Sequence, residues 1–201
     1  MTPISRRTVL FLVLCMPVVA RAQTFNGPLL GVEIGQQHLI GGSLVNGVDT
    51  LQDDARLVTG GFAGARLQRR GFVIGGELGA GRTNGDLSLS ETTLTVDYRN
   101  QSQWHWQLHA GPTIGSRTLL FAYLCEVTRQ FDVTITQPSG VTPQEDEQGL
   151  LRFGVGVETT VRGPVHGRIS AGTSRADFGD RPLNKAIGRR FEVAAAVVVQ
   201  F

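Results

Sequence analysis

Apolar side chains alternate with polar or small ones along several segments of this chain, and this alternation limits its fold more than any other feature. In the last segment, residues 190–201, every odd-numbered position from Phe191 to Phe201 is apolar, while Glu192 and Gln200 stand on the even-numbered face. Successive side chains of a β-strand point to opposite faces, so this period of two predicts a strand with one apolar face. Helical periodicity is hard to find anywhere after residue 22.

The same alternation predicts eight strands, and the connections between them fall into two classes. The other seven strands are expected at residues 29–37, 57–68, 72–81, 104–115, 119–131, 151–162 and 165–174. The short turns are residues 69–71, 115–118 and 162–164, and the long polar loops are residues 41–54, 82–103, 132–149 and 175–188. An even strand number with short turns at one end and long loops at the other is typical of a transmembrane barrel. We therefore predict an all-β fold, an eight-stranded antiparallel up-and-down transmembrane β-barrel with short periplasmic turns and long extracellular loops.

The first 22 residues have the pattern of a cleaved signal peptide. Arg6 and Arg7 precede an apolar run at residues 9–20, and small residues stand at Ala20 and Ala22. A charged start, a short apolar core and an A-x-A exit are typical of secretion signals, and the run is shorter than the roughly 20 residues of a membrane helix. We expect residues 1–22 to be removed and residues 23–201 to form the barrel domain. The paired arginines also fit a twin-arginine signal, but the very apolar core and the lack of a cofactor motif favour the general secretory route.

The polar face of the predicted strands carries charges of both signs, which indicates that it points into the barrel. Lys185 is the one lysine of the chain, although lysine is common on sheets that face water. Buried carboxylates and guanidinium groups are stable when they neutralise one another, and glycines on the same face would leave room beside them. The predicted lumen network consists of Glu33, Arg66, Glu77, Glu126, Arg152, Glu158, Arg168 and Glu192.

Aromatic residues near the strand ends, on the apolar face, predict two girdles at the membrane interfaces. The expected members are Phe72, Trp104, Trp106, Phe121, Tyr123, Phe153, Phe191 and Phe201. The last strand, with Phe191, Val193, Val197, Val199 and the terminal Phe201, resembles the C-terminal assembly signal of bacterial outer-membrane barrels.

With the signal peptide and the eight strands, this ending makes residues 29–201 resemble the porin-like family of the OmpA transmembrane domain, OmpX and opacity-type surface proteins. The resemblance implies location in the bacterial outer membrane. It also implies contact with outer-membrane lipids and lipopolysaccharide, and recognition of the C-terminal strand by the assembly machinery. Members act as envelope structure, adhesins or host-facing antigens, and a few related barrels modify lipids. The resemblance implies an adhesin-like or structural role here, without catalysis.

Motifs of catalysis and of cofactor binding are absent, so no cofactor, metal or catalytic residue is expected. His105 and His109 share a face, but four residues of strand separate them by roughly 13 Å. His166 and Ser170 have the same spacing and stand on the polar face, whereas a lipid-modifying hydrolase would need them at the lipid face. The stretch Glu145–Glu147 is expected to be a solvated loop, and Cys125, the one cysteine after residue 22, an inert apolar side chain.

The overall charge argues against a nucleic-acid-binding protein, which is expected to carry a basic excess, because 19 basic residues are balanced by 17 acidic ones. Three alternatives to a structural or adhesin-like barrel stay open from the sequence. They are a soluble periplasmic lipocalin-like barrel that binds an apolar ligand, an outer-membrane enzyme that modifies lipid A, and a pore. The first predicts an apolar lumen, the second a Ser or His essential for activity, and the third large stable conductance steps.

Overall fold

The computed structural model describes residues 24–45, 48–91, 94–177 and 190–201, and the predicted signal peptide, residues 1–22, lies outside them. The described residues form strands and tight turns. The strands are β1 (Gly27–Val45), β2 (Val48–Arg69), β3 (Phe72–Thr83), β4 (Asp86–Glu91), β5 (Leu94–Ile114), β6 (Thr118–Gln137), β7 (Gly140–Arg162), β8 (Val165–Asp177) and β9 (Arg190–Gln200).

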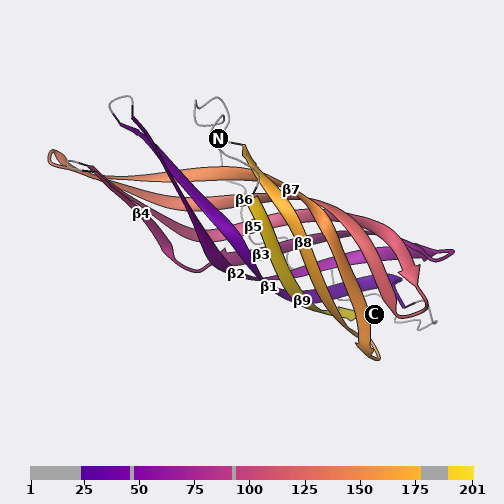
Figure 1. Ribbon diagram of the computed structural model, residues 1–201. Coiled ribbons are helices and arrows are strands. Elements are labelled where there is room, and N and C mark those ends of the chain that lie inside the picture. Colours follow the sequence, from indigo (N-terminus) through magenta and orange to yellow (C-terminus); the bar gives the residue numbers. More distant parts are fainter. Residues whose placement is uncertain (1–23, 46–47, 92–93, 178–189) are drawn as a thin grey trace, which may run out of the picture.

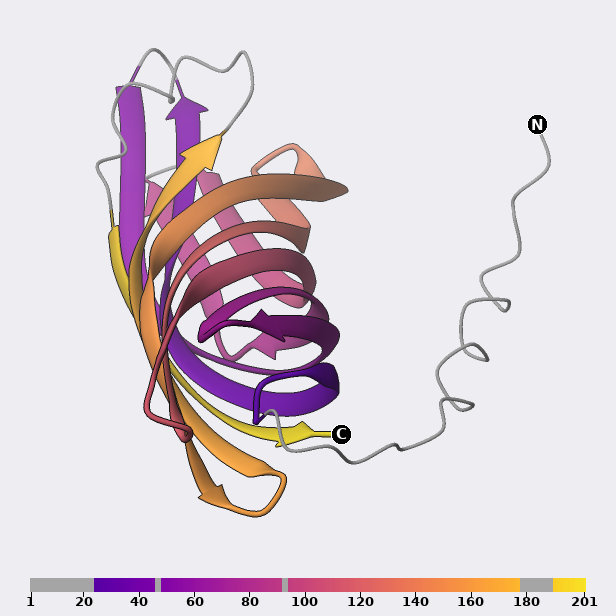
Figure 2. The same ribbon diagram turned by 90° about the vertical axis from the view of Figure 1, so that its right-hand side faces the viewer.

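The strands form one closed antiparallel sheet (Figures 1 and 2). Their order is β3-β2-β1-β9-β8-β7-β6-β5-β4, and a pairing of β3 with β5 closes the ring. Because β3 and β4 pair in succession with β5, they count as one strand interrupted at Asn84 and Gly85, and the barrel is eight-stranded. Gly85 has a φ of 106°, which a glycine adopts at little cost. The predicted fold class is confirmed.

In the part of the chain that the structure describes, no helix is long and apolar enough to cross a membrane.

Three of the predicted long loops are wrong in one respect, because the strands continue through most of them. β1 and β2 stay paired as far as Val45 and Val48, and β6 and β7 as far as Gln137 and Gly140. The paired hairpins extend well beyond the barrel on the left of Figure 1, and the C-terminus lies at the opposite end. Polar residues in these segments favoured loops over strands, although period-two alternation continues in places, with Val133 and Ile135 set between polar neighbours. Of the fourth predicted loop, residues 175–177 belong to β8 and residues 178–188 lie outside the described residues.

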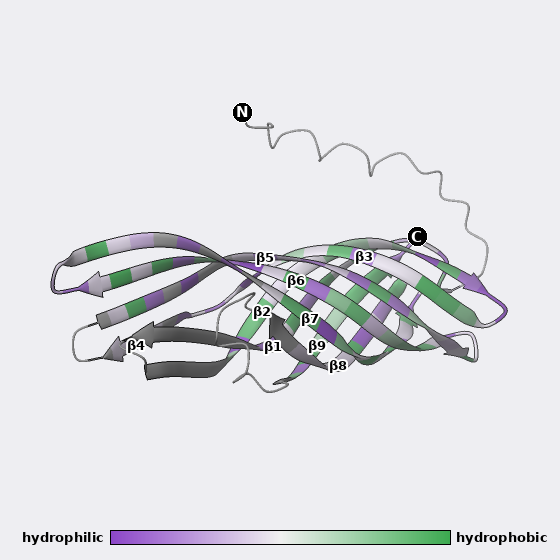
Figure 3. Ribbon diagram, turned by 90° about the horizontal axis from the view of Figure 1, so that it is seen from above, coloured by the Kyte–Doolittle hydropathy of each residue, from purple (hydrophilic) through white to green (hydrophobic). Residues whose placement is uncertain are grey.

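The outer wall of the barrel is apolar. Leu67, Leu78 and Val155 expose 65%, 66% and 64% of their surface, and each strand of the barrel carries exposed large apolar side chains. Water-soluble monomers rarely expose continuous apolar areas of this extent. Figure 3 shows hydrophobic and hydrophilic residues alternating along the barrel strands. The predicted apolar faces point outward on every strand except β6.

On β6 the predicted sides are reversed. Phe121, Tyr123 and Cys125 are buried inside the barrel, whereas Leu120 and Leu124 are exposed on the outer wall. Residues 119–125 are apolar on both faces, so alternation alone could not choose between them. The large rings of Phe121 and Tyr123 fit inside because glycines stand opposite them on β7, Gly156 and Gly154.

Candidate functional site

Two arginines and two glutamates form a closed ring across the lumen. Arg66 of β2 donates two parallel hydrogen bonds to Glu158 of β7, with N–O distances of 2.7 and 2.8 Å. Arg168 of β8 does the same to Glu77 of β3, at 2.6 and 2.8 Å. Arg66 also reaches Glu77 at 3.2 Å, and Arg168 reaches Glu158 at 2.8 Å. Each guanidinium therefore contacts both carboxylates, and the four charges neutralise one another.

Strand register explains how this ring forms. Glu158 and Arg168 stand directly opposite each other on β7 and β8. Arg66 and Glu77 face glycines on each other's strand, Gly75 and Gly64. The missing side chains give the long ones room to turn across the lumen, since an eight-stranded barrel is just wide enough to be filled by side chains.

Neighbouring groups complete the ring's contacts. His166 Nδ1 lies 3.0 Å from Glu158, and the Gln107 amide donates to Glu77 at 3.4 Å. The Arg168 guanidinium lies 4.9 Å from the ring centroid of Phe62 and 5.5 Å from that of Phe121. Aromatic faces attract cations, and more so where water is excluded. The ring is thus surrounded by groups that either bond to it or exclude water from it.

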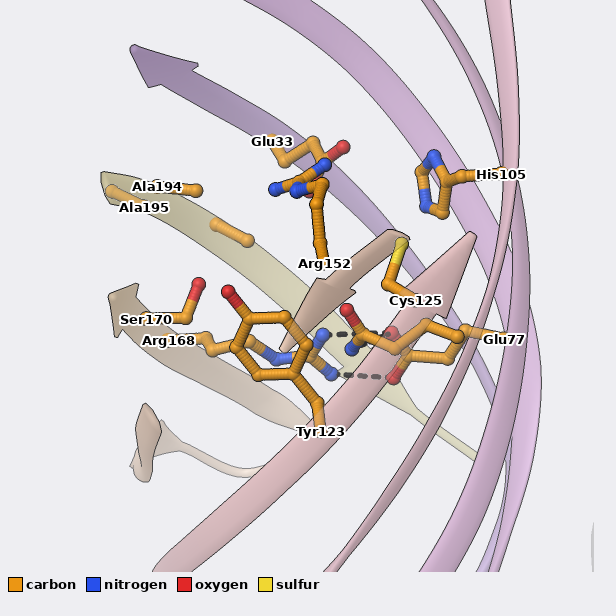
Figure 4. A pocket seen from close by; sticks show the side chains of 12 residues that line it. Glu33, Glu77, His105, Tyr123, Cys125, Arg152, Arg168, Ser170, Ala194 and Ala195 are labelled. Carbon is orange, nitrogen blue, oxygen red and sulfur yellow. Dashed lines mark hydrogen bonds and ion pairs between the residues drawn. The ribbon is translucent and has the colours of Figure 1, made fainter. Parts of the chain in front are cut away.

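A second polar cluster lies further toward the hairpin end. Arg152 Nε lies 2.8 Å from Glu192, and the Ser174 hydroxyl donates to Glu192 at 2.8 Å. Between the cluster and the ring is a cavity of about 20 Å³, and Figure 4 shows Glu33, His105, Cys125 and Tyr123 among the side chains around it. That volume holds a water molecule but no larger solute.

Apolar side chains close the lumen at the end with the short turns. Phe25, which precedes β1, is fully buried, and its ring packs edge-on against His166 with centroids 5.1 Å apart. Its backbone N–H donates to the Gln68 side chain, and the Asn26 side chain accepts from the Gln68 backbone N–H. This anchors the segment before β1 in the mouth of the barrel. Val73 and Leu119 are fully buried in the same cluster.

The opposite end is also filled. Arg129, 1% exposed, donates to Gln37. Further along the hairpins, Val96 and Val133 are buried where β5 and β6 continue past the barrel. Apart from the small cavity, the described lumen is therefore filled by side chains from one end to the other.

The structure places the predicted network residues as follows. Arg66, Glu77, Arg152, Glu158, Arg168 and Glu192 are buried inside, and Glu33 lines the cavity. Glu126 is not in the lumen, and that prediction is wrong. It is exposed on the outer wall, where it accepts a hydrogen bond from Trp106 Nε1 at 2.7 Å. The prediction failed because Glu126 lies on β6, whose sides are reversed.

Phe121 and Tyr123 were predicted in an interfacial girdle and are instead buried in the lumen. The other predicted aromatic residues lie on the outer wall: Phe72, Trp104, Phe153, Phe191 and Phe201 are exposed, and Trp106 is half-buried. Val193 and Val197 of the last strand are exposed, and Val199 is half-buried on the same face.

Sequence reasoning missed Arg129 and Phe25. Arg129 follows from the same reversal of β6. Ile114 of β5 is exposed and pairs with Thr118 of β6 across the tight turn. Directly paired residues point to the same face of a sheet, so the even-numbered residues of β6 point outward. Arg129, which is odd-numbered, therefore points into the lumen. Phe25 has no comparable signal, because it lies outside the alternating segments.

The chemistry that this interior supports is charge neutralisation. His166 and Ser170 point into the lumen, where His166 bonds to Glu158 and Ser170 lines the small cavity. Among the described residues, no group of three or more His, Cys, Asp and Glu side chains could hold a metal ion.

Comparison with known proteins supports the fold. No family model and no curated protein matches the chain. Among solved structures it resembles Ail, the attachment invasion locus protein of Yersinia pestis, with a TM-score of 0.50 and 9% identity in its complex with the heparin analogue sucrose octasulfate. The match covers 88% of this chain and 98% of that chain. A major outer membrane protein of Thermus thermophilus matches with a TM-score of 0.50 and 13% identity over 85% of this chain and 99% of that one. The chain thus has the fold of eight-stranded outer-membrane barrels.

Proposed function

We propose that this chain is an integral outer-membrane β-barrel with a closed lumen and a structural or surface-interaction role. One observation carries the proposal: the barrel is apolar outside and charged inside. A soluble barrel has the opposite arrangement, because its polar face meets water. An apolar wall around a neutralised polar interior is what the hydrocarbon layer of a membrane requires.

In the proposed orientation the short turns face the periplasm and the paired hairpins face the outside. The N-terminal end of β1 and the C-terminus lie at the short-turn end, where Leu29 pairs with Gln200. Export by the predicted signal peptide delivers the chain to the periplasm. The last strand, ending in Phe201, is the proposed signal for the assembly machinery, and exposed aromatic residues such as Phe191 and Phe153 are the proposed interfacial anchors.

The closed lumen argues against a pore. Solutes would have to pass the ring of Arg66, Glu77, Glu158 and Arg168, and the Phe25 cluster at the short-turn end. The charged lumen also argues against the lipocalin-like alternative, which needs an apolar cavity. The inward direction of His166 and Ser170 argues against a lipid-modifying hydrolase that uses them.

A surface role would fall on the hairpins. The β6–β7 hairpin, residues 132–149, carries four acidic residues and no lysine or arginine. Its charge disfavours a sulfated polyanion such as the heparin analogue that Ail binds, and matches a cationic or neutral partner.

The test is to fractionate cells that express the full chain and to compare boiled with unboiled samples by gel electrophoresis. We expect the protein in the outer-membrane fraction, with faster migration before boiling because the closed barrel survives the detergent. Planar-bilayer recording of the same protein is expected to give no large stable conductance steps. Recovery in the soluble periplasmic fraction would overturn the membrane assignment, and stable steps would overturn the closed lumen.

A further inference from the structure

The outer wall carries an apolar groove of about 310 Å³ over β2, β3 and β5. Small residues, Ala63 and Gly76, form its floor, and Leu78, Leu108 and Trp106 rise beside them. Leu78 and Leu108 expose 66% and 55% of their surface. The groove therefore opens away from the barrel, toward the surroundings of the wall.

Beyond the groove, in the direction of the hairpins, the same face of β2 and β3 carries small residues and then Arg82. The next pair on this face after Ala63 and Leu78 is Gly61 and Ala80. The pair that follows is Thr59 and Arg82. Arg82 is exposed and lies four residues beyond Leu78, or about 13 Å along the strand. Small residues, Gly61 and Ala80, thus lie between the groove and the exposed Arg82 on the same face of the wall.

Trp106 fixes the edge of the groove on β5. Its Nε1 donates to Glu126 at 2.7 Å, on the side turned away from β3. The bond ties the indole, which lines the groove, to β6, and Glu126 is separated from Arg82 of β3 by β5. Trp104, 47% exposed, stands opposite Ala80.

We propose that this groove is a binding site for lipid A, the anchor of lipopolysaccharide. An acyl chain would lie on Ala63 and Gly76, and a lipid phosphate would pair with Arg82. The proposal rests on the outer-membrane function proposed above, because the hairpin end then faces the outer leaflet, where lipid A resides. Charge complementarity selects the occupant, since arginine is well suited to binding phosphate. A zwitterionic phospholipid offers the same acyl chain but neutralises its own phosphate.

Two substitutions test the two halves of the site separately. Gly76→Leu fills the groove. A Cβ at Gly76 would come no closer than 3.6 Å to Leu108, so the barrel can accept the new side chain. Arg82→Ala removes the cation. Gly167→Leu is a matched control, because a Cβ there meets only Val161, at 3.6 Å, on the outer wall of β8. Arg162→Ala removes an exposed arginine at the short-turn end.

Binding is measured on the full mature barrel in detergent by native mass spectrometry, with lipid A, dephosphorylated lipid A or phosphatidylethanolamine added. We expect one lipid A to be retained by the wild-type barrel. Gly76→Leu and Arg82→Ala should each weaken retention about tenfold, as expected for loss of a charge-assisted contact or of a buried acyl segment. Dephosphorylated lipid A should bind the wild type as weakly as lipid A binds Arg82→Ala. The two control variants should bind like the wild type.

Equal retention by Gly76→Leu and the wild type would overturn the proposal, as would phosphatidylethanolamine retained as tightly as lipid A. Each variant is first checked for heat-modifiable migration, so that loss of folding is not read as loss of binding. If the wild-type barrel inserts into vesicles but retains no lipid A, the site is refuted and the membrane assignment stands. If it fails to insert, both are refuted.

Discussion

Arg66 and Glu158, 92 positions apart in the sequence, join opposite parts of the barrel wall through two parallel hydrogen bonds. Their strands, β2 and β7, are not neighbours in the sheet. The pair therefore acts as a brace through the lumen, in addition to the hydrogen bonds that hold adjacent strands. Arg168 and Glu77 form a second brace beside it.

Substituting one member of the ring should destabilise the barrel strongly. Glu158→Gln removes a negative charge from between two buried arginines, and loss of one partner from such a pair costs about 3–5 kcal/mol. Urea unfolding of the barrel in lipid vesicles measures the change. Glu126→Gln, on the outer wall, keeps an acceptor for Trp106 and should change the free energy of unfolding by less than about 1 kcal/mol. Equal effects of the two substitutions would contradict a ring that braces the lumen.

Glycines of the lumen and of the outer wall should differ in their tolerance of a methyl group. A Cβ at Gly156 would overlap the ring of Phe121, whereas at Gly76 its nearest neighbour, Leu108, is 3.6 Å away. Gly156→Ala should cost about 1–3 kcal/mol, the usual range for overpacking, and Gly76→Ala should stay within about 0.5 kcal/mol. The same unfolding experiment compares the two variants. If Gly76→Ala lowered the free energy of unfolding and Gly156→Ala did not, the lumen and outer faces would be assigned the wrong way round.

The Cys125 thiol should be unreactive in the folded barrel. It is 1% exposed and lines the small cavity inside the lumen. A water-soluble maleimide is therefore expected to leave it unmodified in vesicles and to label it fully after denaturation, as mass spectrometry would show. Rapid labelling of the folded protein would mean that the lumen admits solutes, against the closed interior proposed here.

The sequence was sufficient for the strand pattern wherever one face alone is apolar. On β7, for example, Arg152 and Glu158 share one face while Phe153 and Val157 share the other, and the structure has them on those sides. On β6 the run from Leu119 to Cys125 is apolar on both sides, so the strand's own pattern carried no information about direction. The direction of each β6 side chain is set by the register of β6 with β5 and β7. That register is known only once the strands are paired in the structure.

The individual contacts of the ring could not be predicted either. The alternation along each strand predicts that Arg66 and Glu158 both point into the lumen. Which arginine contacts which carboxylate depends on how far neighbouring strands are shifted along one another, and on the space left beside Gly64 and Gly75. The length of the hairpins was missed for another reason. The projecting parts of β5 and β6 keep the alternation in Leu94 and Val96 and in Val133 and Ile135, but these short runs stand among polar residues that favoured loops.

Contact of the apolar wall with lipid can be measured through the chain's two tryptophans, Trp104 and Trp106, because both lie on the outer wall of β5. The mature protein is folded into vesicles whose acyl chains carry bromine, which quenches indole fluorescence on contact. If the apolar wall faces lipid, the brominated chains should strongly quench the tryptophan emission, and iodide in the surrounding water should have little effect. Strong quenching by iodide with none by the brominated chains would place this wall in water and contradict the account.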